Sequence, residues 1–222
     1  MADVDAVVAE LCAAADPARL AGMARVGIRT DRALGVSVPS VRRIARRHRR
    51  DQQLALALWA TGIHEARILA PMVADPAAVT QAQLDAWVAD LDSWDVCDGL
   101  CGSLLVRVPQ AWELVERYAA REPGFERRAG FALLATLAVH DKGAGDEVFR
   151  ARLPLIEQAA PDPRNEVRKA VNWALRQIGK RNAALHGDAI ATAERILAAG
   201  PRSARWVASD ALRELRSRTP PA

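Results

Sequence analysis

Helix-start signals recur along the whole sequence, and they restrict the fold more than any other feature does. Asp, Ser and Thr side chains accept hydrogen bonds from the free N–H groups of a first helical turn, and proline fits that turn because its missing N–H is not needed there. Such signals stand at Asp16 with Pro17, at Ser37 with Pro39, at Asp51, and at Thr80 with Gln83, which have the spacing of a capping box. Later segments are separated by Pro109, Pro123, Pro163 and Pro201. The sequence therefore predicts short helices from end to end.

Between these signals, strand-like alternation of apolar and polar residues is nearly absent, and aromatic residues make up only 5% of the chain. We predict an all-α fold of about a dozen helices. Helix pairs recur about every 35 to 45 residues, which is typical of a superhelical HEAT-like repeat solenoid of antiparallel helix pairs with a concave face. A compact, non-repetitive all-α bundle is the alternative.

The bulk composition indicates a globular protein with an anionic partner. Of the 222 residues, 50% are hydrophobic and 26% are charged, so we expect a single domain over residues 1–222 with a substantial core. The net charge is +4 and the pI is near 9.4, which favours binding to a polyanion. Residues 1–5 are acidic and no apolar run has the length of a bilayer-spanning helix, so we expect a cytoplasmic protein without membrane contact.

The three cysteines, Cys12, Cys97 and Cys101, are an odd set in a chain too large to need disulfides for its core. We expect reduced thiols. Cys97 and Cys101 are four residues apart and could be considered zinc ligands, but the four histidines supply no second pair at ligand spacing. We therefore expect these thiols to pack between helices, with no metal and no cofactor.

Three basic segments lie far apart in the sequence, and a solenoid would bring them to its concave face, which we therefore expect to be basic. The first runs from Arg42 to Arg50, with Arg42 and Arg46 one turn apart, and the second is Arg127 with Arg128. The third surrounds Trp173 and consists of Arg164, Arg168, Lys169, Arg176, Lys180 and Arg181. A run of this kind is often no more than a solvated face. Cations around an aromatic side chain, however, are suited to a polyanion that also carries a group on which the aromatic ring can stack.

Trp94 and Asp98 are the second informative pair, because residues four apart share one face of a helix. A carboxylate beside an indole suits a cation within the polyanion. The remaining tryptophans stand among apolar residues and predict core or half-buried packing; they are Trp59, Trp87, Trp112 and Trp206. We interpret the segments around His64 and His140 as hydrogen-bonding residues at helix junctions.

Several segments in order resemble the DNA alkylation repair family, the HEAT-like repeat DNA glycosylases of the AlkD type. They are Gly35–Arg42, Trp59–Arg67, Ser93–Asp98, Arg128–Ala132 and Lys169–Arg176, and the similarity extends from about Gly35 to Leu215. The resemblance implies excision of cationic N3- and N7-alkylated purines from double-stranded DNA, without extrusion of the base. It also implies an association with the bacterial nucleoid, and we expect the protein to act as a monomer.

The resemblance further implies a role for each matching residue. Asp98 matches the catalytic aspartate, and Trp94 and Trp173 match the two tryptophans at the lesion. Arg128 matches the arginine that holds the DNA backbone, although a one-residue shift would exchange it with Arg127. Two alternatives of another class stay open: a HEAT-repeat DNA-binding protein without excision activity, and a protein-interaction scaffold.

Overall fold

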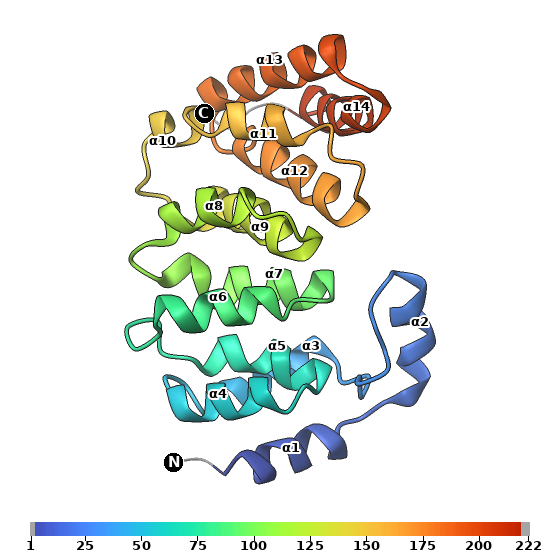
Figure 1. The fold of residues 1–222 in the computed structure, drawn as a ribbon, viewed down its shortest axis with the longest axis vertical. Coiled ribbons are helices and arrows are strands. Elements are labelled where there is room, and N and C mark those ends of the chain that lie inside the picture. Colours follow the sequence, from blue (N-terminus) through green and yellow to red (C-terminus); the bar gives the residue numbers. More distant parts are fainter. Residues whose placement is uncertain (1–2, 219–222) are drawn as a thin grey trace. The chain divides into compact units, whose positions relative to one another are not determined.

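The computed structural model describes residues 3–218, and within them it contains fourteen α-helices, two short 3₁₀ helices and no strand (Figure 1). The all-α prediction is confirmed. The chain divides into two compact units, Met1–Pro109 and Gln110–Ala222. Within residues 3–218, none of the helices has both the length and the apolar character needed to span a bilayer.

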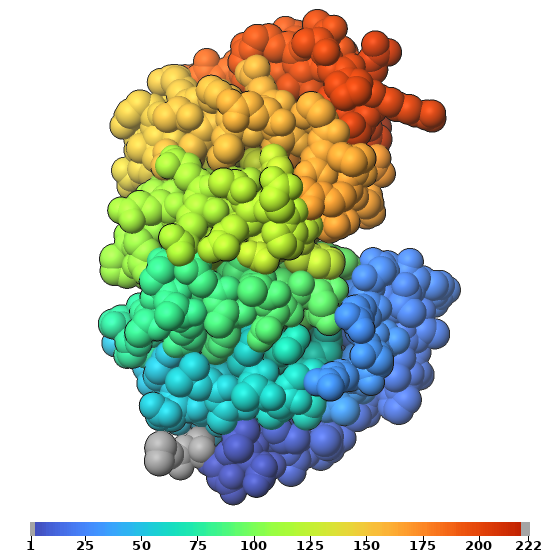
Figure 2. Space-filling view, viewed as in Figure 1, coloured from blue at the N-terminus to red at the C-terminus, as the bar shows by residue number. Residues whose placement is uncertain are grey.

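In the first unit, α5 lies at the centre of the packing and contacts α3, α4 and α7. Its elements are α1 (Val4–Ala13), η1 (Pro17–Arg19), α2 (Leu20–Arg25), α3 (Val38–Ala45), α4 (Gln52–Ala60), α5 (His64–Val73), α6 (Gln81–Ala89), α7 (Trp94–Ser103) and η2 (Leu105–Arg107). Residues 26–37, which we call the joining segment, connect α2 to α3. In the space-filling view, α2 and the joining segment lie in blue against the cyan and green helices of this unit (Figure 2).

In the second unit, α9 and α12 form the core, because α9 packs against both α8 and α12 and α12 packs against α14. The elements are α8 (Ala111–Ala119), α9 (Gly124–His140), α10 (Asp146–Arg150), α11 (Leu153–Ala159), α12 (Asn165–Ile178), α13 (Ala183–Ala199) and α14 (Arg202–Arg216). The middle of α9 is almost wholly buried, from Arg128 to Ala138. A helix that is apolar all round is expected only where other helices cover every side.

The predicted helix starts are confirmed. Asp16 caps η1, and Ser37 and Asp51 accept hydrogen bonds from the first turns of α3 and α4. Thr80 caps α6 by accepting from the N–H of Gln83, whereas the side-chain carbonyl of Gln83 accepts from Gln52 at 2.6 Å. The Gln83 side chain therefore links α6 to α4.

Contacts between successive repeats reveal the repeat length. In the first unit, four side-chain contacts join residues 31 positions apart: Gln52 with Gln83, Trp59 with Asp90, His64 with Asp95, and Glu65 with Leu34. In the second unit the common separation is 38, as between Arg128 and Glu166 and between Arg150 and Asp188. The predicted period of about 35 to 45 holds for the second unit and is wrong for the first, because helices of nine or ten residues with short links need fewer residues per repeat.

Glu65 fixes the joining segment from inside the first unit. Its side chain is buried, and its carboxylate accepts three backbone N–H groups, from Leu34 at 2.8 Å, Gly35 at 2.7 Å and Val36 at 3.2 Å. Gly35 has a φ of +78°, and a β-carbon there would overlap the carbonyl of Asp16. A buried carboxylate is stable only when such donors surround it. The segment therefore has one well-defined path across α5.

Three of the four tryptophans assigned to packing are buried or half-buried. Trp59 and Trp87 stack with ring centroids 4.4 Å apart, and Trp112 contacts Phe149 edge-on at 5.2 Å. The prediction is wrong for Trp206, which is 38% exposed on α14. Its ring is covered in part by the guanidinium of Arg168, whose Cζ lies 5.0 Å from the ring centroid. A guanidinium thus takes the place of the expected apolar neighbours.

Candidate functional site

Helix α7 presents Trp94 and Asp98 together. Ser93 precedes the helix in an extended conformation, so Trp94 is its first residue, and Asp98 follows one turn later on the same face. Trp94 is 37% exposed, and its indole N–H donates to the carbonyl of Val26 at 3.1 Å. Asp98 is half-buried. An exposed aromatic face beside a partly desolvated carboxylate is suited to a cation.

A histidine–aspartate pair fixes the start of α7. His64, the first residue of α5, lies with its Nε2 2.8 Å from Asp95 Oδ2, and Asp95 also accepts from the hydroxyl of Ser93 at 2.5 Å and from the N–H of Val96 at 3.0 Å. Burial alone would lower the pKa of His64, but the hydrogen bond and charge of Asp95, with Glu65 and Asp92, raise it above 6.5. Burial alone would raise the pKa of Asp95, but the hydrogen bond and charge of His64 lower this pKa below 3.8.

This pair predicts a pH-dependent contribution to stability. Because the pKa of His64 is raised, the protonated side chain stabilises the fold fully below pH 6.5, and this contribution is lost as the pH rises through the pKa of His64 in the folded protein. Because the pKa of Asp95 is lowered, its carboxylate stabilises the fold above pH 3.8. We expect His64→Gln to be most destabilising between about pH 4 and 6.5 and less so at pH 9. Urea denaturation across this range measures the difference, and a loss independent of pH would contradict a charged pair.

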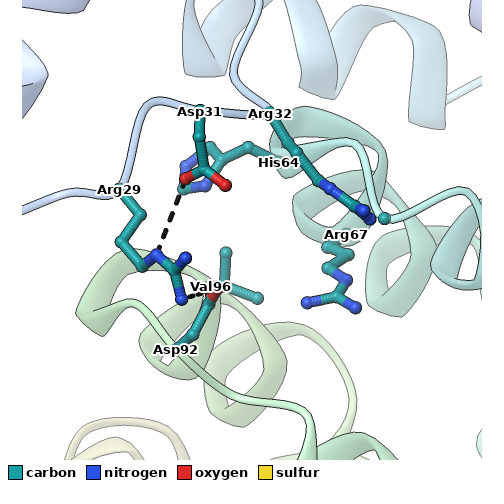
Figure 3. A pocket seen from close by; sticks show the side chains of 8 residues that line it. Arg29, Asp31, Arg32, His64, Arg67, Asp92 and Val96 are labelled. Atoms are coloured by element: carbon teal, nitrogen blue, oxygen red, sulfur yellow. Dashed lines mark ion pairs between the residues drawn. The ribbon is translucent and has the colours of Figure 1, made fainter.

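Beside the start of α7 lies a pocket of about 270 Å³ (Figure 3). It is lined by Arg29, Asp31, Arg32, Gly62, His64, Arg67, Asp92 and Val96. The guanidinium of Arg29 lies 3.6 Å from Asp31 and 3.3 Å from Asp92. No pattern in the sequence indicates this pocket, because its arginines come from both the joining segment and α5. The spacing of 31 residues between contacting repeats is the signal that relates α5 to α7.

The first basic segment lies at the C-terminal end of α3. Arg42 and Arg46 are exposed, and Arg46 is the C-cap residue that follows the last residue of the helix. Arg47 is ion-paired with Glu10 of α1. Within residues 3–218, no carboxylate lies within salt-bridge distance of Arg42 or Arg46. Both are therefore available to pair with an anion.

The two arginines of α9 have different surroundings. Arg128 is only 5% exposed, and its Nη1 donates to the carbonyl of Glu166 at 2.8 Å, which joins α9 to the first turn of α12. Arg127 is half-buried, with its Nε 3.6 Å from a carboxylate oxygen of Asp162. The buried guanidinium of Arg128 is suited to positioning α12, and Arg127 is the more accessible of the two.

On α12, Trp173 is half-buried and Lys169 is exposed one turn before it. Arg176 lies on the next turn of α12 and Lys180 just after the end of the helix, and both are ion-paired with Glu214 of α14. Burial would raise the pKa of Glu214, but these two cations lower it to about 2. The basic stripe predicted around Trp173 is therefore partly neutralised within the unit, and Lys169 is its most accessible cation.

The cysteines and acidic residues offer no metal site in the part of the chain that the structure describes: no group of three or more His, Cys, Asp or Glu side chains is placed to hold an ion within residues 3–218. Cys97 and Cys101 are buried free thiols on α7, and Cys12 is an exposed free thiol. The expected packing role of Cys97 and Cys101 agrees with their burial.

Comparison with known proteins finds a matching family model and similar solved structures. A family model described as "DNA alkylation repair enzyme" matches residues 7–215. A solved structure described as "A new family of proteins related to the HEAT-like repeat DNA glycosylases with affinity for branched DNA structures" is similar with a TM-score of 0.79 and 18% identity, over 100% of this chain and 99% of that one. An engineered protein is similar over 98% of both chains, with 15% identity and a TM-score of 0.44. No curated protein matches the chain significantly.

Proposed function

Because the chain belongs to the DNA alkylation repair enzyme family, we propose that it is a DNA glycosylase that removes cationic N3- and N7-alkylated purines from duplex DNA. The observation that carries the proposal is the pair on α7, where the exposed Trp94 stands one turn before the half-buried Asp98. The HEAT-like repeat fold, which the chain shares with the solved neighbour, is consistent with a DNA-binding role.

The chemistry demanded of these residues is modest. Alkylation at N3 or N7 gives the purine a positive charge, so the base leaves neutral and the sugar becomes an oxocarbenium ion. No general acid is needed for the leaving group. A fixed negative charge beside the developing sugar cation stabilises the transition state, and in a partly desolvated position it contributes on the order of several kcal/mol. Asp98 supplies this charge in the proposal, and its second oxygen orients the attacking water.

The tryptophans would act on the sugar. An aromatic face attracts a cation by about 1 to 2 kcal/mol when water is excluded, and we assign this contribution to Trp94 and Trp173. Acting from the sugar side requires no pocket for an extruded base, in contrast to glycosylases that flip the base. Specificity would then follow from the charge and lability of the lesion, with little reading of base edges.

The basic residues would hold the phosphate backbone. Arg42, Arg46 and Lys169 are exposed and Arg168 is half-buried, so these four are the main candidates for direct phosphate contacts. Arg127, Arg176 and Lys180 would first have to leave the carboxylates of Asp162 and Glu214. Arg128 would act by fixing the first turn of α12.

One assay tests the proposal directly. The protein is incubated with duplex DNA methylated by a simple alkylating agent, and the released bases are separated and quantified. We expect 7-methylguanine and 3-methyladenine in the soluble fraction and abasic sites in the duplex. Unmodified DNA treated in parallel is the control and should release no purine. Binding to the methylated duplex without any release would refute the glycosylase assignment.

A DNA-binding protein without excision activity is the second candidate. The structurally similar protein is described by its affinity for branched DNA. If this chain has the same function, it should bind three-way or four-way junctions more tightly than linear duplex and release no base. Competition between a labelled junction and unlabelled duplex separates the two candidates, because a glycosylase of the proposed type requires only a duplex with a lesion.

Single substitutions of the tryptophans should slow excision without unfolding the protein. We expect Trp94→Ala and Trp173→Ala each to reduce the single-turnover rate about 10-fold, since a contact of about 1.4 kcal/mol in the transition state corresponds to one decade. Trp112→Ala is the matched control, because Trp112 packs on Phe149 and donates to Asp141 at 3.0 Å. It should lower the melting temperature instead. A destabilised Trp94→Ala variant with a normal rate would assign Trp94 to packing.

A further inference from the structure

Three arginine side chains reach the pocket of the first unit from two parts of the chain. Arg29 and Arg32 belong to the joining segment, and Arg67 belongs to the first turn of α5 (Figure 3). Guanidinium groups present several N–H donors in one plane, which suits the oxygens of a phosphate or carboxylate. An anion is therefore the chemical class of ligand that this pocket favours.

The charges around the pocket do not cancel. Both carboxylates in its wall lie against Arg29, since Asp31 and Asp92 are 3.6 Å and 3.3 Å from it. In the part of the chain that the structure describes, no carboxylate lies within salt-bridge distance of Arg32 or Arg67. His64 is balanced by Asp95. Arg29, Arg32 and Arg67 together exceed Asp31 and Asp92 by one positive charge, which matches a ligand group with a single negative charge.

The two guanidinium groups have different surroundings. Arg32 lies across the turn between α4 and α5, where Gly62 has a φ of +69° and a β-carbon would overlap Arg32 Nη1. Arg67 lies over Trp59, with Cζ 5.5 Å from the ring centroid, and its Nη1 donates to the carbonyl of Asp90 at 3.3 Å. The Nε of Arg67 is buried and, among residues 3–218, has no hydrogen-bond partner. Arg67 is thus positioned before any ligand arrives, and the exposed Arg32 lies beside the turn that forms the pocket wall.

We propose that this pocket binds one phosphate of the DNA backbone. The inference rests on the proposed function in requiring that the protein binds DNA, and it does not require excision activity. Helices α5 and α7 both begin at the pocket, at His64 and just before Val96, so their N-terminal partial charges add to the two guanidinium groups. Val96 in the wall stands between Trp94 and Asp98 in the sequence. The pocket therefore adjoins the helix that carries both residues.

The salt dependence of binding to undamaged duplex tests this site separately from excision. The variants are Arg32→Ala, Arg67→Gln and the double variant, and the control is Arg107→Ala, which removes an exposed arginine of η2. We expect the slope of log affinity against log salt to become shallower by up to about 0.9 in each single variant and by no more than about 0.9 in the double, because only one phosphate is lost. The control should keep most of the slope of the unmodified protein.

Two outcomes for the slope would contradict a single phosphate site. An unchanged slope in the double variant would overturn the proposal, and a decrease of about 1.8 would mean two separate phosphate contacts in place of one pocket. A melting temperature that rises with millimolar inorganic phosphate in the unmodified protein and not in Arg32→Ala, with equal DNA slopes, would identify free phosphate as the ligand. If Arg67→Gln fails to fold, Arg32→Ala alone decides. If the slopes change as expected but no base is released from methylated DNA, the glycosylase assignment is refuted and the pocket assignment stands.

Discussion

Asp98→Asn should reduce excision of 7-methylguanine by about 100-fold or more while leaving the affinity for duplex DNA nearly unchanged. The substitution keeps the shape and volume of the side chain and removes only its charge. If that charge stabilises the oxocarbenium ion, its loss raises the barrier by about 2.7 kcal/mol or more, at about 1.36 kcal/mol per decade. Because the ground state has no developed sugar cation, the effect should fall on the rate constant and not on binding.

Single-turnover release of 7-methylguanine, with enzyme in excess over lesions, measures this rate constant. Glu113→Gln is the matched control, since Glu113 is an exposed carboxylate of α8 and its substitution changes the net charge equally. It should excise at the rate of the unmodified protein. Full activity in Asp98→Asn would remove Asp98 from the catalytic role, and a lowered melting temperature with full activity would assign it to the stability of α7.

The features that depend on neighbouring residues in the sequence were predictable. Capping residues act within one turn, so Ser37 and Asp51 identified the starts of α3 and α4. Likewise, the interval of four between Trp94 and Asp98 placed both on one face of α7. In each case the physical interaction spans only a few residues, so the spacing along the chain determines it.

The contacts between repeats were not predictable in the same way. Glu65 binds the N–H groups of residues about one repeat away, and Arg176 meets Glu214 at a separation of 38. A partner at this distance depends on the exact repeat length, which differs between the two units, and no internal sequence identity reveals it. The burial of Arg128 has the same cause, because α12 covers it. An arginine in a basic run therefore cannot be assigned to solvent or to DNA from sequence alone.

Affinity for undamaged duplex should fall steeply with salt, with a slope of log affinity against log salt near −5 if five or six phosphates are neutralised at about −0.9 each. Between 50 and 200 mM salt this corresponds to a loss of about 1,000-fold. Replacing Arg42, Arg46 and Lys169 together by alanine should flatten the slope by up to about 2.7, because these exposed cations have no carboxylate within salt-bridge distance in the described part of the chain. The weakening should be the same for every duplex sequence. A slope near zero in the unmodified protein would favour the protein-interaction scaffold.

The salt dependence of DNA binding can also test whether Arg176 and Lys180 contact DNA, because both are paired with Glu214. While its carboxylate binds Arg176 and Lys180, replacing both cations by alanine should change the slope little. Glu214→Gln removes the competing charge, so it should steepen the slope by up to about 1.8 and tighten binding at low salt, as two further phosphates are neutralised. If the double alanine variant already flattens the slope by that amount in the presence of Glu214, DNA displaces the carboxylate. Arg176 and Lys180 would then belong to the DNA contacts that the sequence predicted.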